Sequence, residues 1–341
     1  MLIVQTYSIA VALCFVTMLC WGSWGNTQKL ASSDKWKFQL FYWDYGLGIL
    51  LSSLAIAFTL GSLFNDGRGF VADISQAGWE PMAWAFLGGV LFNLSNILLV
   101  IAIDIAGLAV AFPIGVGLAL VIGTLQTAFF RPGEVGSSPL LFAGVAFVVV
   151  AIIINAVAYK KLMAAKSAAS KSGGAALGIV ISVIAGVLMG GGFFGLVSKG
   201  MIQNFAVPEA GLMTPYTALV VFAAGLFVSN FLWNTIASLA PVRGERVNPL
   251  HYFTKGTVKL HAVGVLGGTI WNFGMAFSLV AASAAGAALS YALGQCATMV
   301  AAVWGVFIWK EFKGAPKGTS TLLAAMFVSF FIGIAFLVAS K

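Results

Sequence analysis

The feature that most constrains this chain is a series of long apolar runs. A helix needs about 20 apolar residues to cross the hydrocarbon core of a membrane. A membrane β-barrel would instead show short segments of alternating hydrophobicity. The continuous runs therefore predict an all-α integral membrane protein with ten transmembrane helices. The runs cover roughly residues 3–28, 38–61, 82–103, 107–130, 138–158, 175–198, 213–239, 260–281, 285–309 and 319–339.

Composition excludes a soluble protein. Only 8% of the 341 residues are charged and 60% are hydrophobic, whereas a soluble domain carries about 25% charged residues. The net charge of +8 would suggest nucleic acid as a partner of a soluble protein. Here the basic residues lie in short connections between apolar runs, so they indicate membrane orientation instead. We expect a lipid bilayer, and no nucleic acid, as the partner.

The distribution of Lys and Arg predicts which connections face the cytoplasm. Of the 18 basic residues, 14 lie in the connections after the first, third, fifth, seventh and ninth runs. Cytoplasmic connections carry the excess of positive charge, so we expect both termini outside. The segment 159–174 then becomes a basic cytoplasmic linker. It separates a first five-helix unit, residues 1–158, from a second, residues 175–341.

The two units resemble each other. LGGVLFN at 87–93 is similar to LGGTIWN at 266–272, and WGSWGNTQK at 21–29 is similar to GGFFGLVSK at 191–199. Five spans is an odd number, so the second copy must be inverted in the membrane. Inverted repeats with a binding site near the midplane are typical of secondary transporters.

Asp44, in the segment FYWDYG, is the acidic residue that lies well inside an apolar run. An acid at the bilayer centre costs about 2.5–3.5 kcal/mol on insertion scales, and such residues usually serve a function. The functional hypothesis is that Asp44 binds and releases a proton during transport. The alternative is an interfacial carboxylate, because Asp44 lies about two helical turns from the predicted cytoplasmic edge.

Polar and aromatic side chains within the runs could bind a solute. Asn93 and Asn96 are three residues apart, and Tyr291 and Gln295 are four apart, so each pair shares a helix face. Amides and phenols pair with the donors and acceptors of a small polar molecule. The alternative is contact between helices, worth about 0.6 kcal/mol each. The predicted substrate-binding residues are Trp24, Tyr45, Asn93, Asn96, Trp271, Asn272, Tyr291 and Gln295.

Several functions lack their sequence signatures. The chain has no phosphate-binding G-x-x-x-x-G-K-[ST] motif, no Ser–His–Asp or H-E-x-x-H pattern, and no cluster of residues with metal-ligand spacing. The three cysteines all lie inside apolar runs, where a free thiol behaves as a small hydrophobic group. We therefore expect no enzyme activity, no cofactor and no bound metal.

Four motifs resemble those of a known superfamily. GSW at 22–24 is similar to a G-T-W of ureide permeases, and YWDYG at 42–46 to their Y-L-D-Y-T. LSNILL at 94–99 is similar to a third-span segment carrying Gly–Asn. VWGVFIWKEF at 303–312 resembles their W-G-(I/V)-x-L-F-x-E-Y segment. The chain thus resembles the drug/metabolite transporter superfamily, in the branch of ureide permeases, glucose/ribose-type sugar porters and the rhamnose–proton symporter.

The resemblance implies a fold of two inverted five-helix repeats and uptake of a small polar metabolite across a bacterial inner membrane. It departs at Gly25, where ureide permeases have Pro, and in the short central linker. We expect import of a small neutral solute, foremost a sugar, by proton symport with alternating access. The alternatives are a ureide or nucleobase permease of the same fold, a multidrug or metabolite exporter, and a non-transporting scaffold or receptor. The sequence leaves the oligomeric state open.

Overall fold

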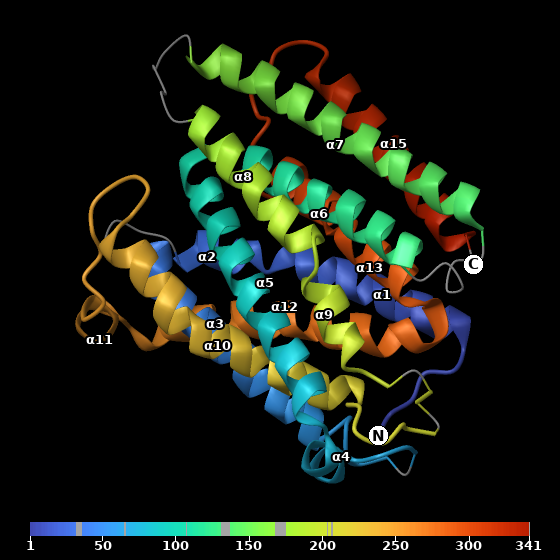
Figure 1. Ribbon diagram of the computed structural model, residues 1–341. Helices are drawn as coiled ribbons and strands as arrows, with labels where there is room; N and C mark the ends of the chain where they lie inside the picture. Colours follow the sequence, from blue (N-terminus) through green and yellow to red (C-terminus); the bar gives the residue numbers. More distant parts are fainter. Residues whose placement is uncertain are drawn as a thin grey trace.

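The computed structural model describes residues 1–31, 36–64, 66–106, 108–130, 137–167, 175–202, 204–205 and 207–340. Within these ranges the protein is a bundle of helices (Figure 1). Nine helical segments are long and apolar enough to cross a membrane, which confirms a multi-pass membrane protein. They are Tyr7–Ala31, Phe38–Phe58, Trp79–Ala106, Ser138–Leu162, Ala176–Lys199, Pro215–Leu239, Val258–Ala285, Ala287–Ile308 and Thr319–Val338.

The fourth predicted run forms helix α6, Leu108–Phe130. Within it, Ala111–Gln126 is a shorter apolar helix. The tenth membrane crossing therefore stays a prediction. Pro113 lies inside this helix, where it removes one backbone hydrogen bond.

Three of the predicted runs are broken rather than continuous. The first contains α1, Tyr7–Ser23, and α2, Gly25–Ala31, with a break at Trp24. The sixth contains α8, Ala175–Gly190, and α9, Phe193–Lys199, with a break at two glycines. The ninth is divided into α13, Ala287–Gln295, α14, Ala297–Val303, and a π-helix, η2, Trp304–Ile308. Hydropathy misses such breaks because a one- or two-residue turn leaves the apolar run intact.

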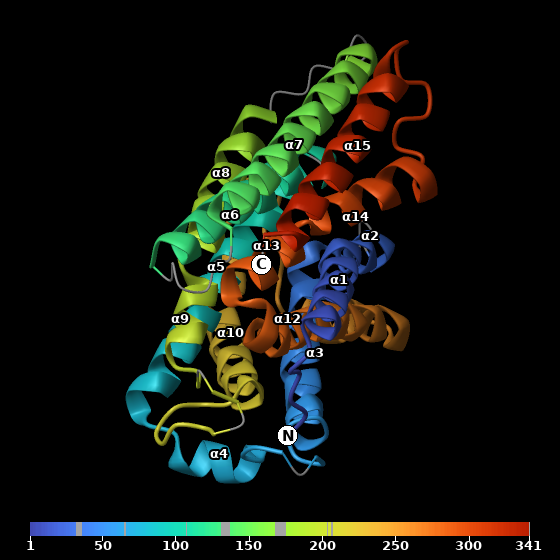
Figure 2. The same ribbon diagram turned by 90° about the vertical axis from the view of Figure 1, so that its right-hand side faces the viewer.

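The core of the bundle contains α3, Phe38–Phe58, α5, Trp79–Ala106, α10, Pro215–Leu239, and α12, Val258–Ala285. Helix α3 packs on α10 and α12, and α10 also packs on α5. The helices α7, Ser138–Ser167, and α15, Thr319–Val338, pack against each other and lie side by side in both Figures 1 and 2. The broken segments α1–α2 and α8–α9 pack on α12 and α5, respectively.

Matching contacts occur where α5 meets α10 and where α12 meets α3. A Cβ on Gly89 would overlap the carbonyl oxygen of Phe222, and a Cβ on Gly268 would overlap that of Tyr45. Small residues allow such close approach of membrane helices. One turn further on, Asn93 Nδ2 donates to Ser229 Oγ at 3.0 Å, and Asn272 Nδ2 donates to Ser52 Oγ at 2.9 Å. The similar segments 87–93 and 266–272 therefore make similar helix contacts.

We expect Gly268→Ala to destabilise the fold, because its new Cβ would collide with the backbone of α3. Overpacking of this kind costs about 1–3 kcal/mol. Unfolding of the purified protein by SDS titration would measure the loss. Gly195→Ala is the matched control, since a Cβ at Gly195 meets nothing within 4 Å. Equal stability of both variants would contradict the close helix crossing.

The beginning of α1 and the end of α15 lie at the same end of the bundle. The Tyr7 hydroxyl donates to the carbonyl oxygen of Val338 at 2.6 Å. Two short helices cover the connections: α4, Phe70–Gln76, on the side of the N-terminus, and α11, His251–Lys255, at the other end (Figure 1). The predicted linker 159–174 begins as a continuation of α7 to Ser167, and its residues 168–174 lie outside the described ranges.

Candidate functional site

A small central hollow of about 30 Å³ lies between the broken helices and the core helices. It has room for one or two water molecules. Four of the predicted substrate-binding residues, Trp24, Asn96, Trp271 and Gln295, line it. The other lining residues are Trp21, Phe92, Leu99, Phe112, Val116, Met189, Phe193 and Ala297.

The walls of the central hollow are mainly aromatic. The Trp271 ring lies 4.4 Å from Phe92 and stacks on Trp21 at 5.9 Å, with 15° between the ring planes. The Trp24 ring lies 4.9 Å from Tyr45. Aromatic faces attract other flat rings through dispersion and quadrupole interactions. A planar solute would fit such walls once they separate.

Polar groups at the hollow retain unused hydrogen-bonding capacity. Asn96 Nδ2 donates to the Tyr42 hydroxyl at 2.9 Å. Gln295 is 4% exposed and lines the hollow, and a side-chain hydrogen bond joins it to Tyr291. The buried Tyr45 hydroxyl, beside Trp24, has no partner among the described residues. An amide offers two donor hydrogens and two acceptor sites, so Asn96 and Gln295 can still pair with a solute.

Asn93 and Asn272 lie outside the central hollow. Asn93 accepts from the Tyr42 hydroxyl at 3.1 Å and donates to Ser229 and to the Leu226 carbonyl. Asn272 bonds with Ser52 and Ser53 of α3. Their amides thus hold helices together, which is the alternative that the sequence left open. Their predicted contact with substrate has no geometric support in this conformation.

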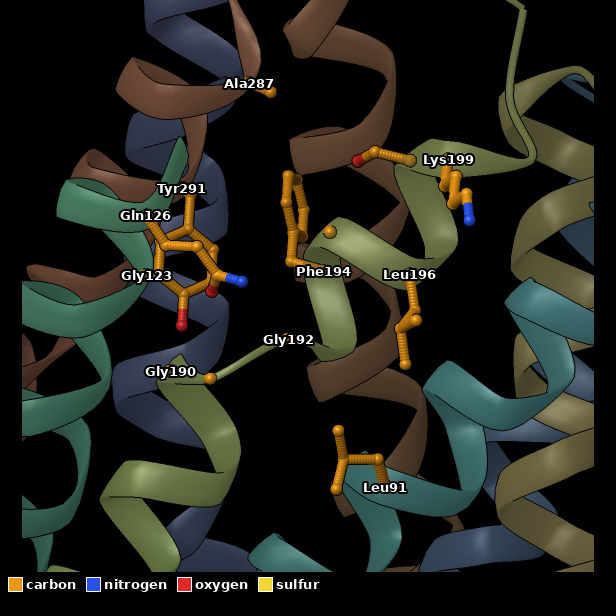
Figure 3. A pocket seen from close by; sticks show the side chains of 13 residues that line it. Leu91, Gly123, Gln126, Gly190, Gly192, Phe194, Leu196, Lys199, Ala287 and Tyr291 are labelled. Carbon is orange, nitrogen blue, oxygen red and sulfur yellow. The ribbon is translucent and has the colours of Figure 1, made fainter. Parts of the chain in front are cut away.

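Tyr291 lines a second and larger hollow of about 380 Å³. Figure 3 shows Tyr291 and Gln126 on one side of it and Phe194 and Leu196 on the other. Tyr291 packs on Phe194 with 5.2 Å between ring centroids, and its hydroxyl donates to Ala119 O at 3.3 Å. The second hollow has the size of a small-molecule site, so a solute could enter the protein here.

Asp44 lies apart from both hollows, within a hydrogen-bonded cluster. Its side chain is 2% exposed. The Tyr252 hydroxyl of α11 donates to Asp44 Oδ1 at 2.5 Å, and His261 Nδ1 lies 2.9 Å from Asp44 Oδ2. Burial and this hydrogen bond to Asp44 raise the pKa of Tyr252, so the phenol stays a donor. The side chain of His261 is 30% exposed and links the buried carboxylate to the surface.

Sequence reasoning missed several residues of these sites. Tyr252 lies in a connection and His261 in the first turn of α12, and nothing in the sequence places them beside Asp44. Trp21, Phe92 and Phe193 resemble many other aromatic residues in membrane helices, where they commonly face lipid. Only the break at Trp24, beside several glycines, offered a usable signal, because discontinuous helices often border transport sites.

The chain is similar over its whole length to proteins of one family. The ureide permease family model matches residues 41–173 and 161–340. Ureide permease 1 of Arabidopsis thaliana is 25% identical over 100% of this chain and 99% of its own length, and ureide permease 4 of the same plant is 22% identical with the same coverage. A solved crystal structure with 16% identity covers 96% of each chain at a TM-score of 0.59, which shows a shared fold.

These relatives support the ureide permease branch of the expected superfamily, and they give no support to a sugar as the solute. The family match covers most of the chain, and the nine apolar helices fit it. This chain belongs to the ureide permease family of membrane transporters.

Proposed function

We propose that this protein is a permease for a small, planar solute that carries amide groups, such as a ureide or a nucleobase. The carrying observation is the central hollow, where the aromatic faces of Trp24 and Trp271 lie beside the amides of Asn96 and Gln295. A flat ring would stack between the aromatic walls while the amides pair with its N–H and C=O groups. The names of the relatives point to the same chemistry.

Transport by alternating access follows from the position of the broken helices. Trp24 lies at the break between α1 and α2, and Phe193 follows the break between α8 and α9. Both residues line the central hollow. In its present size the hollow is too small for a ureide, so binding requires the half-helices to move apart. The equivalent glycine and asparagine contacts of the two halves support an inverted repeat.

The proposed coupling ion is a proton carried by Asp44. The neighbouring residue Tyr45 packs on Trp24 of the central hollow, and Tyr42, two residues earlier, bonds to Asn96. Helix α3 therefore connects the carboxylate cluster with the solute site. The charge distribution supports a cytoplasmic position for the end that carries α2 and α11. Both termini would then lie outside a bacterial inner membrane.

Ligand binding tests this function. We expect ureides or nucleobases, and not hexoses or pentoses, to raise the thermal unfolding temperature of the purified protein. Gln295→Leu removes an amide that lines the central hollow and should lower the affinity for the stabilising ligand about 5- to 100-fold, the equivalent of about 1–3 kcal/mol.

Gln126→Leu is the matched control, because Gln126 lines the second hollow and not the central one. Equal loss of affinity in both variants would move the binding site away from the central hollow. Stabilisation by sugars alone would favour the sugar-porter hypothesis over the ureide permease. Outward transport in vesicles would indicate an exporter. A protein that binds none of these solutes would fit a scaffold or receptor.

A further inference from the structure

Three hollows follow one another along the ninth segment of the chain. Ala287 and Tyr291 line the second hollow, and Gln295 and Ala297 line the central one. A third hollow of about 20 Å³ contains Thr298, Ala301 and Gly305, and ends at Glu311. The ninth segment therefore borders three hollows, with the wide one at its Ala287 end and a narrow one at its Glu311 end.

The narrow end is closed by contacts between the two halves. Lys29 Nζ of α2 lies 2.7 Å from Glu311 Oε1 and 4.4 Å from the centroid of the Trp309 ring. Trp309 Nε1 donates to Asn26 Oδ1 at 2.6 Å. Trp304 Nε1 donates to Ser23 Oγ at 2.9 Å. An ion pair, a cation–π contact and one hydrogen bond thus fasten the half-helix α2 to residues 309–311, and a second hydrogen bond fastens the end of α1 to Trp304.

The wide end has an equivalent lysine without this fastening. In the similar segments WGSWGNTQK and GGFFGLVSK, Lys199 of α9 corresponds to Lys29 of α2. Lys199 Nζ lies 3.8 Å from the centroid of the Trp84 ring and points away from Tyr291 and Gln126 (Figure 3). Among the described residues, no carboxylate forms an ion pair with Lys199. The open hollow is therefore at the unfastened end.

We propose that Lys29 and Glu311 form the gate at the α2 end of the transport path, and that their ion pair must break before a solute passes there. That a solute passes the gate rests on the proposed permease function. That the ion pair closes the α2 end of the bundle does not depend on that function. Lys29 and Glu311 are positioning residues: they lie at the end of the path, do not line the central hollow, and hold α2 in place. The wide second hollow and the closed gate together define a conformation open towards the α9 end.

Glu311 also contacts Gly305, so a substitution at Gly305 can disturb the ion pair without changing a charge. The backbone N–H of Glu311 donates to Gly305 O at 2.9 Å. A Cβ added to Gly305 would lie 3.0 Å from Glu311 Oε2. Gly305→Ala should therefore shift the carboxylate by a few tenths of an ångström and weaken its ion pair with Lys29 without removing either charge.

Thr298 provides a reporter behind the gate. Its side chain lines the third hollow, is 2% exposed, and its hydroxyl has no partner among the described residues. In a background with Cys14, Cys20 and Cys296 replaced by Ala, Thr298→Cys can be labelled with a small water-soluble methanethiosulfonate in proteoliposomes. The labelling rate is measured twice, once with the reagent on the α2 side of the membrane and once with it on the α9 side. The measurement requires no substrate.

We expect Lys29→Ala, Glu311→Ala and Gly305→Ala each to raise the labelling rate from the α2 side about fivefold. A partly exposed ion pair contributes up to about 1 kcal/mol, which corresponds to a factor of about five in the population of the open gate. The exchanged pair Lys29→Glu with Glu311→Lys should return the rate towards that of the parent. Lys199→Ala, the equivalent lysine at the other end, should leave it unchanged. In transport, the gate variants should change kcat more than KM.

An unchanged labelling rate in all three gate variants would overturn the gate. An equal increase with Lys199→Ala would show general loosening of the bundle and would overturn it as well. Increased labelling in a protein that binds neither ureides nor nucleobases would keep the gate and reject the proposed substrate. The two proposals therefore fail separately.

Discussion

Asp44→Asn should abolish proton-driven accumulation of solute while leaving solute exchange intact. A pH gradient of one unit stores about 1.4 kcal/mol per proton, which permits about tenfold accumulation at one proton per solute. Asn keeps the size of the side chain and can still bond to Tyr252, but it cannot carry a proton. Uptake into proteoliposomes with an imposed gradient measures the effect, and counterflow without a gradient measures exchange.

Asp104→Asn is the matched control for this experiment. Asp104 lies near the end of α5, a membrane-spanning helix, and is exposed, so the same chemical change removes no buried carboxylate. We expect Asp104→Asn to accumulate solute like the parent protein. Gradient-driven accumulation by Asp44→Asn would show that Asp44 is not the proton carrier. Loss of both accumulation and exchange would indicate instead that the Asp44 carboxylate stabilises the packing of α3, α11 and α12.

The membrane-spanning segments could be predicted from the sequence because hydropathy is summed over about 20 residues in each segment. Asp44 could be singled out for a related reason, since one carboxylate contrasts with the apolar residues around it. Its partners could not be predicted. Tyr252 and His261 are 208 and 217 residues away along the chain, and only the packing of α11 and α12 brings them to Asp44.

The residues proposed from the sequence for the solute site divide into those that line the central hollow and those that lie outside it, and the division has a physical reason. Amides inside membrane helices either line cavities or join helices. The sequence does not show which amides find hydrogen-bond partners on a neighbouring helix. Asn93 and Asn272 meet serines on neighbouring helices, whereas Gln295 bonds to Tyr291 of its own helix and lines the central hollow. The similar segments LGGVLFN and LGGTIWN drew attention to Asn93 and Asn272, and in both segments the asparagine bonds to a serine at a helix crossing.

Asp73 illustrates a buried charge that could not be singled out from sequence alone. It lies in α4, outside the membrane-spanning segments, and its side chain is 0% exposed. Arg68 Nε donates to Asp73 Oδ1 at 2.5 Å, and Asp73 Oδ2 accepts from the backbone N–H and the hydroxyl of Thr214 at 2.8 and 2.9 Å. Arg68 also donates to the carbonyl of Leu212. The cluster joins the connection before α5 to the connection before α10, one from each half.

Asp73→Ala should lower the free energy of unfolding by about 3–5 kcal/mol, because removing one partner leaves the Arg68 charge and two Thr214 donors without their acceptor in a buried place. SDS titration of the purified protein measures this loss. Glu80→Ala deletes a carboxylate from the exposed surface, where it only accepts a hydrogen bond from Trp84, so we expect it to change stability by less than about 1 kcal/mol. If Asp73→Ala were no less stable than Glu80→Ala, the two connections would not depend on this ion pair. A loss confined to Asp73→Ala would show that charges at the rim of the bundle, and not only its apolar core, hold the two halves together.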